Sequence, residues 1–194
     1  MPTTLGSVMC SRTRVALHAE NTDFTLLDPG VPYILAAYVG MDQNLLSSDL
    51  WSINWRYRTA GSILPWEPIT LSSNGVYCAG TAQTSLVHGT AVTSANKQCV
   101  NNGSHVDCFT ERDINTFGSG VALNIGQNSE AQVAIRFDRA LPGRVIELNF
   151  RVNIGGADSD SNLIRVIIPD NIVYSDNPNP KLATTLKSGW NRFI

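Results

Sequence analysis

The chain has 194 residues and a formal net charge of −2, from 14 lysines and arginines and 16 aspartates and glutamates. This balance gives no electrostatic reason to bind nucleic acid, so we expect no nucleic-acid partner. No apolar run reaches the roughly 18 to 20 residues of a membrane-spanning helix, and we expect no membrane partner. The length suits one β domain with a single core.

We expect three parts in chain order: an N-terminal polar arm at residues 1–12, a β domain at 13–174 and a C-terminal arm at 175–194. The N-terminal arm lacks the apolar central segment of a secretory signal, so export by that route is not expected. The C-terminal arm opens with a Pro/Asn linker, in which two alternate prolines prevent sheet pairing.

Alternation of apolar and polar residues gives the fold class of the middle part. In WSINWRYR, residues 51–58, every second side chain is large and apolar, and the pattern returns in VIELNFRVNI and QVAIRFD. Alternation at period two is typical of antiparallel strands with one buried and one wet face. We therefore predict an all-β, antiparallel β-sandwich or jelly-roll-like domain, with these residues nearly fully buried: Trp55, Ile135, Phe137, Leu148, Phe150 and Val152.

Turn chemistry separates the predicted strands. The turn segments are DPG at 28–30, NG at 74–75, LPG at 141–143 and GGADSDSN at 155–162. The strands between them are 14–18, 32–39, 51–58, 69–72, 85–88, 106–110, 121–124, 131–137, 145–154 and 162–168.

Three cysteines, Cys78, Cys99 and Cys108, lie in the polar middle of the chain, and Cys10 lies in the N-terminal arm. Two interpretations stay open for the clustered three: one internal disulfide, or free thiols used as small core residues. A zinc site requires close ligand pairs, and the single pair of His105 with Cys108 does not supply one. We expect no metal and no cofactor.

The segment DSDSN, residues 158–162, begins like a calcium loop, but Leu163 replaces the turn glycine and Pro169 replaces the bidentate glutamate. We interpret it as a polar hairpin turn. No motif for nucleophilic catalysis accompanies the three histidines. A glycosidase pair drawn from Asp138, Glu147 and Asp158 depends on how the chain folds. We therefore expect a protein that is not an enzyme.

Candidate contact residues are the apolar residues of the C-terminal arm, Trp190, Phe193 and Ile194, together with Trp66 in the segment LPWEP. The arm either anchors in a neighbouring subunit or folds back on its own domain. The arginines on the polar strand faces either form a solvated face or dock onto an acidic surface. These are Arg56, Arg58, Arg136, Arg151 and Arg165.

Over residues 14–168, the chain resembles β-sandwich modules found in tailed-phage structural proteins and in uncharacterised surface proteins. The segments that carry the resemblance are, in order, VPYILAAYV, LWSINWRYRTAG with LPWEPI, a Cys-containing polar middle, SEAQVAIRF and VIELNFRVNIGG. The resemblance implies a virion component made in the host cytoplasm, such as a capsid decoration, minor capsid or fibre subunit. Its partners would be major capsid or tail proteins and copies of itself. The alternative is a carbohydrate-binding or adhesin module that presents Trp66 to a glycan.

Overall fold

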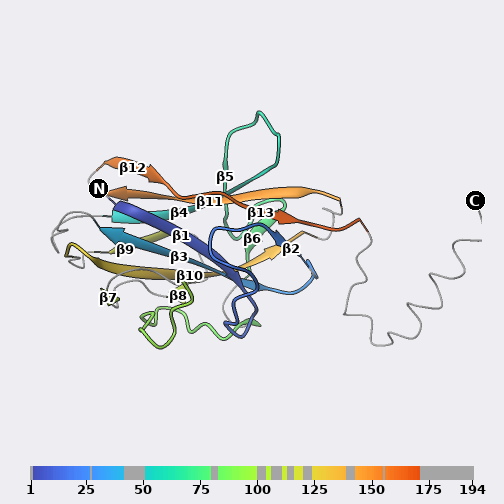
Figure 1. Ribbon diagram of the computed structural model, residues 1–194. Helices are drawn as coiled ribbons and strands as arrows, with labels where there is room; N and C mark the ends of the chain where they lie inside the picture. Colours follow the sequence, from blue (N-terminus) through green and yellow to red (C-terminus); the bar gives the residue numbers. More distant parts are fainter. Residues whose placement is uncertain are drawn as a thin grey trace, which may run out of the picture.

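A computed structural model describes residues 2–26, 28–41, 51–79, 83–99, 104–105, 111–112, 116–119, 124–138, 143–154 and 156–170. These residues form strands and connecting loops, with no α-helix among them. The strands belong to two sheets that lie in two layers (Figure 1). The all-β prediction is confirmed at this level.

Sheet A has the strand order β1-β3-β10-β6, and β7 and β8 also pair with β10. Its strands are β1 (Pro2–Cys10), β3 (Tyr33–Met41), β6 (Val76–Cys78), β7 (Ser104–His105), β8 (Glu111–Arg112) and β10 (Gln127–Phe137). The three long strands pair antiparallel, whereas the short β7 and β8 run parallel to β10.

Sheet B has the order β2-β13-β11-β4-β5, with β12 on β11 and β9 on β4. Its strands are β2 (Phe24–Thr25), β4 (Trp51–Thr59), β5 (Glu67–Pro68), β9 (Thr116–Ser119), β11 (Val145–Ile154), β12 (Ala157–Asp160) and β13 (Ile164–Ile167). The two strands with the clearest alternation, β4 and β11, pair antiparallel along nine residues, with Phe150 opposite Trp55.

The main core contains residues of both sheets. All six side chains predicted for the core are at most 1% exposed, so the predicted inward face of these strands is confirmed. Alternation sends the apolar residues of β4, β10 and β11 into this core because successive side chains of a strand point to opposite faces.

The outer face of sheet A is also covered, because β3 (YILAAYVGM) is buried at every position. Residues 83–99, which we call the cover segment, supply Leu86 and Cys99 to a second apolar cluster with Ile34 and Ala36 of β3. A continuous apolar run is the pattern expected of a strand buried on both faces.

The predicted N-terminal polar arm is wrong for Pro2–Cys10. These residues form the edge strand β1, which pairs with β3 from Pro2↔Met41 to Cys10↔Ile34, and Val8, Met9 and Cys10 are buried. The segment LGSVMC shows no clean alternation because both of its faces pack: Met9 lies in the main core, and Val8 and Cys10 lie in the second cluster.

Several predicted strands differ from the structure. Residues 14–18, 69–72 and 85–88 lie in loops, although Ala16 bridges to Cys10. Of the predicted turn at 155–162, residues 157–160 form β12, so the hairpin turn is shorter than expected. The predicted strand 106–110, most of the strand 121–124 and most of the turn 141–143 lie outside the described residues, as does the whole predicted C-terminal arm.

Candidate functional site

Among the predicted contact residues, the structure describes only Trp66, since Trp190, Phe193 and Ile194 lie outside the described residues. Trp66 lies at the end of the loop between β4 and β5 and is half-buried. The guanidinium carbon of Arg58 lies 4.4 Å from its ring centroid and that of Arg56 lies 5.3 Å from it. These cation–π contacts fix the ring against β4.

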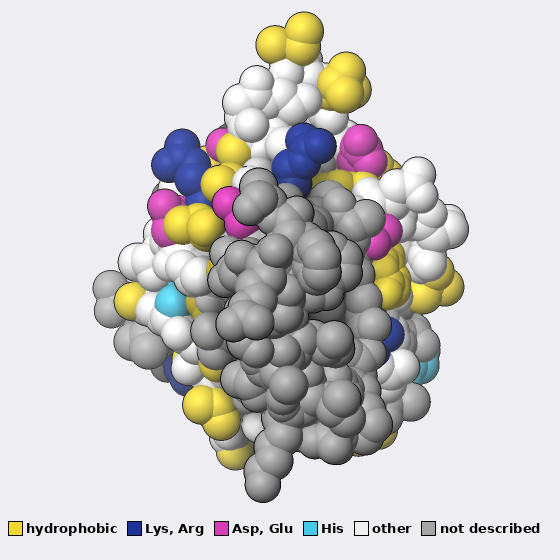
Figure 2. All heavy atoms as spheres, turned by 90° about the vertical axis from the view of Figure 1, so that its right-hand side faces the viewer, with side chains coloured by type: hydrophobic (Ala, Val, Ile, Leu, Met, Phe, Trp, Pro, Cys, Tyr) yellow, Lys and Arg dark blue, Asp and Glu magenta, His cyan; other side chains and the backbone are white. Residues whose placement is uncertain are grey.

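The loop that ends at Trp66 carries the most exposed large apolar side chain in the described part of the chain. We call residues 60–66 the apolar loop. Ile63 is fully exposed (101%) and Leu64 is 63% exposed. The loop projects from sheet B (Figure 1), and hydrophobic side chains gather at the tip of the molecule on that side (Figure 2).

The base of the apolar loop is held by specific contacts. The Ser62 backbone N–H donates to the Thr59 carbonyl at 3.0 Å, and the Leu64 N–H donates to Ser62 Oγ at 3.1 Å. At the next strand, the Tyr57 hydroxyl donates to Glu67 Oε2 at 2.7 Å. The loop is therefore anchored at both ends while its tip is open to solvent.

Four of the five predicted outward arginines lie on the outer face of sheet B, and each is paired with a carboxylate. Glu147 accepts from Arg58 Nε at 2.7 Å and lies 3.6 Å from Arg165 Nε. Asp160 lies 2.7 Å from Arg151 Nε and 3.0 Å from Arg56 Nη2. Hydrogen bonds from Arg151 and Arg56 lower the pKa of the Asp160 carboxyl.

At two positions of β11, this pairing corrects the prediction that the polar face is wet, whereas Arg151, Asp160 and Arg165 remain partly exposed to solvent. Glu147 and Asn149 of β11 are only 5% and 7% exposed, because arginine side chains of neighbouring strands lie against them. Arg56 donates to Asn149 Oδ1 from both Nε and Nη2. The arginine charges are thus largely compensated within the sheet, which leaves less charge for an acidic partner.

The candidate glycosidase carboxylates are not brought together as a free pair. Glu147 is bound to arginines on sheet B, and Asp158 accepts from Arg151 Nη1 at 3.0 Å and from Asn153 Nδ2 at 2.6 Å. Asp138 follows β10 of sheet A. The hairpin carboxylates that resembled a calcium loop are therefore engaged by side chains of β11.

Of the two interpretations left open for the cysteines, a disulfide between Cys78 and Cys99 is not formed, and both thiols are buried. Cys78 lies in the main core between the sheets, whereas Cys99 lies in the second cluster beyond sheet A. Bridging them would require two opposite faces of one sheet to meet. A disulfide to Cys108 stays a prediction, because Cys108 lies outside the described residues.

A buried carboxylate, Glu130, lies on the covered face of sheet A and was missed by the sequence reasoning. It is 0% exposed and accepts hydrogen bonds from the Gln98 N–H (2.9 Å), the Cys99 N–H (2.9 Å) and Gln132 Nε2 (2.7 Å). Burial raises the pKa of Glu130. The polar run QNSEAQ inside a buried strand was the available signal.

The buried thiols around Glu130 are unsuited to nucleophilic chemistry. Burial, together with the charge of Glu130, raises the pKa of Cys10 to about 12 and that of Cys99 well above its usual value. Since the thiolate is the nucleophile, both groups are protonated and unreactive at neutral pH. The role of Glu130 is structural: by accepting hydrogen bonds from the Gln98 and Cys99 N–H groups, it ties the cover segment to β10.

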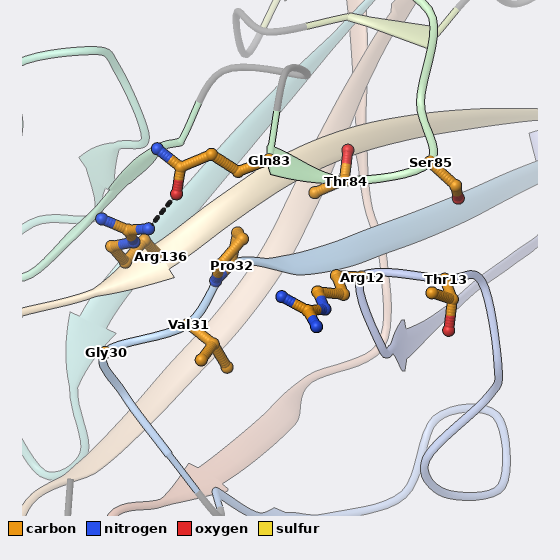
Figure 3. A pocket seen from close by; sticks show the side chains of 9 residues that line it. All are labelled: Arg12, Thr13, Gly30, Val31, Pro32, Gln83, Thr84, Ser85 and Arg136. Atoms are coloured by element: carbon orange, nitrogen blue, oxygen red, sulfur yellow. Dashed lines mark hydrogen bonds between the residues drawn. The ribbon is translucent and has the colours of Figure 1, made fainter. Parts of the chain in front are cut away.

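A cleft of about 590 Å³ opens at one end of sheet A (Figure 3). Its walls come from four places in the chain: the loop after β1, the loop before β3, the start of the cover segment and the end of β10. The lining residues are Arg12, Thr13, Gly30, Val31, Pro32, Gln83, Thr84, Ser85 and Arg136. Arg136 is thus separated from the arginines of sheet B.

Neither a metal centre nor a membrane-spanning helix is found within the described ranges: no three His, Cys, Asp or Glu residues there are grouped to hold a metal ion, and no helix there is long and apolar enough to cross a bilayer. A comparison with models of known protein families finds no match, and a comparison with curated proteins finds no significant match.

Proposed function

We propose that this protein is a non-enzymatic structural subunit of a virus particle, with a β-sandwich of the jelly-roll type that acts by protein–protein contact. The two-sheet fold with its shared core and the sequence resemblance to tailed-phage modules both support this proposal. The protonated thiols and the arginine-paired carboxylates favour contact over catalysis. The expected partners are major capsid or tail proteins and further copies of the chain.

The observation that carries the proposal is the apolar loop. Ile63 is fully exposed and Leu64 is 63% exposed, and neither side chain belongs to the two apolar clusters of the described residues. Burying an aliphatic side chain of this size against a partner contributes about 1.5 to 3 kcal/mol. Because the base of the loop is anchored, less conformational entropy is lost when the tip binds.

Repetition strengthens such a contact. On a particle surface, several copies held by one lattice form each later contact at high effective concentration, so a modest interface becomes hard to remove. The net charge near zero and the internally paired arginines predict an association that depends only modestly on salt.

The test begins with mass spectrometry of particles purified from the source, where we expect the chain at a fixed ratio to the major capsid or tail protein. Recombinant wild type is then added to particles that lack the chain. The double variant Ile63→Asp/Leu64→Asp should bind about a hundredfold more weakly or worse. Ile125→Asp, at a side chain that is 65% exposed elsewhere, is the matched control and should bind as wild type does.

Two results would contradict the proposal. Absence of the chain from purified particles would remove the virion assignment. Wild-type occupancy by the double variant would show that the apolar loop is not the contact.

The carbohydrate-binding alternative through Trp66 is less well supported. A sugar stacks on an open aromatic face, but the Trp66 ring is half-buried and approached by two guanidinium groups. We expect Trp66→Ala to leave any glycan binding unchanged, which a glycan array with both proteins would measure.

A further inference from the structure

The cleft of Figure 3 is formed by two loops, the start of the cover segment and the end of β10, and no residue of the apolar loop lines it. Arg136, near the end of β10, stands at one side, and Arg12, just after β1, stands at the other, with Val31 and Pro32 between them (Figure 3). A smaller hollow of about 240 Å³ adjoins it and shares Gly30 and Arg136. The main cleft is within the size range of small-molecule sites.

Hydrogen bonds join the walls of the cleft and fix its shape. The Ser85 N–H donates to the Arg12 carbonyl at 2.8 Å, and Arg14 Nη2 donates to the Ser85 carbonyl at 3.2 Å. Arg14 has a φ of 64°, and the loop that contains it is closed by the Val15 N–H donating to Ser11 Oγ. On the other wall, the Gly30 N–H donates to Asp28 Oδ1 at 2.8 Å, which shapes the predicted DPG turn. The cleft is therefore pre-formed.

The charge of the cleft differs from that of sheet B. The Arg136 side chain donates to Gln83 Oε1, a neutral partner, and the Arg12 side chain is exposed. Within the described ranges, neither guanidinium forms an ion pair, whereas Arg56, Arg58, Arg151 and Arg165 all do. No carboxylate is among the lining residues of the main cleft; Asp138 lines only the adjoining hollow.

The remaining lining groups are suited to a polyhydroxylated ligand. Thr13, Thr84 and Ser85 offer hydroxyls, Gln83 offers an amide, and Val31 with Pro32 offers an apolar wall. Guanidinium groups bind carboxylate and phosphate through paired, charge-assisted hydrogen bonds. We infer that this cleft binds an anionic sugar, whose carboxylate or phosphate is attracted by the charges of Arg12 and Arg136 on its two sides and whose hydroxyls meet the Thr, Ser and Gln side chains. This site is independent of the proposed contact role of the apolar loop.

The test is a titration of the ¹⁵N-labelled full chain followed by two-dimensional NMR. The probes are glucuronate, glucose 6-phosphate, glucose and inorganic phosphate. We expect at least one anionic sugar to shift the backbone amides of Gly30, Thr84 and Ser85, with glucose and inorganic phosphate about tenfold weaker or more. Absence of such shifts with both anionic sugars would overturn the inference. Inorganic phosphate binding as tightly as the sugars would also overturn it, because the cleft would then recognise an anion alone.

Charge-matched variants place the ligand. Arg12→Gln removes one exposed guanidinium and should weaken binding of the anionic sugar about tenfold or more. Arg144→Gln removes the same charge from an exposed residue that does not line the cleft and should leave the affinity within about twofold. The NMR spectra themselves report whether each variant is folded. Equal affinity of Arg12→Gln and wild type would overturn the assignment.

Discussion

Phe150→Ala tests whether the facing strands β4 and β11 form the centre of the main core. Phe150 is 0% exposed and lies opposite Trp55, with ring centroids 5.6 Å apart and an interplanar angle of 57°. Truncation to alanine removes a buried aromatic ring and leaves a cavity against Trp55. Strand β11 is also paired with β13 and β12, so the backbone cannot easily collapse into that space.

Truncation of a buried phenylalanine costs about 3 to 5 kcal/mol of unfolding free energy, including the cavity. Loss of the tilted aromatic pair contributes about 0.5 to 1.5 kcal/mol beyond burial, which places this site in the upper part of that range. For a chain of this length, each kcal/mol lowers Tm by about 2 to 4 °C, so we expect a decrease of about 6 to 20 °C.

Urea denaturation followed by tryptophan fluorescence measures the effect, with the slope m expected to stay unchanged. Leu71→Ala is the control, because Leu71 is 63% exposed and its truncation should change stability by no more than about 0.5 kcal/mol. A cost below about 1 kcal/mol for Phe150→Ala, or one equal to that of the control, would refute the register of sheet B.

Three further predictions concern sheet A. Gly6→Ala should lower the unfolding free energy by about 1 to 3 kcal/mol in urea titrations, because a Cβ at Gly6 would overlap the Glu20 carboxylate and the Tyr38 ring; wild-type stability would contradict this. Burial lowers the pKa of His18, whose Nε2 accepts a hydrogen bond from the Met9 N–H at 2.9 Å. The contribution of neutral His18 to the unfolding free energy is complete above the unfolded pKa of about 6.5 and is lost as pH falls through the lower folded pKa. Urea titrations from pH 8 to 5 should therefore show a decrease that His18→Gln reduces, and an equal slope in both proteins would refute the role. Finally, Cys10, Cys78 and Cys99 should react with a thiol reagent only after denaturation, and rapid labelling of all three in the folded protein would disprove their burial.

The sequence determined the elements whose pattern reports one buried face. Strands 51–58 and 145–154 alternate cleanly, so both their existence and the inward side chains of Trp55 and Phe150 could be predicted. The turn at DPG was predictable for a similar local reason, since an aspartate accepts from the backbone N–H two residues later.

Tertiary structure decided the features that depend on a second covering layer. The segment of β1 has no clean alternation because both of its faces pack. From the sequence alone, Glu130 would be expected at the surface, but the cover segment buries it and supplies two backbone N–H donors, from Gln98 and Cys99. Arg12 and Arg136 line one cleft although they are 124 residues apart in the chain, and no local pattern encodes this shared position. Alternation along a strand indicates one neighbouring layer, whereas long-range packing determines which polar residues are covered and which arginines form ion pairs among the described residues.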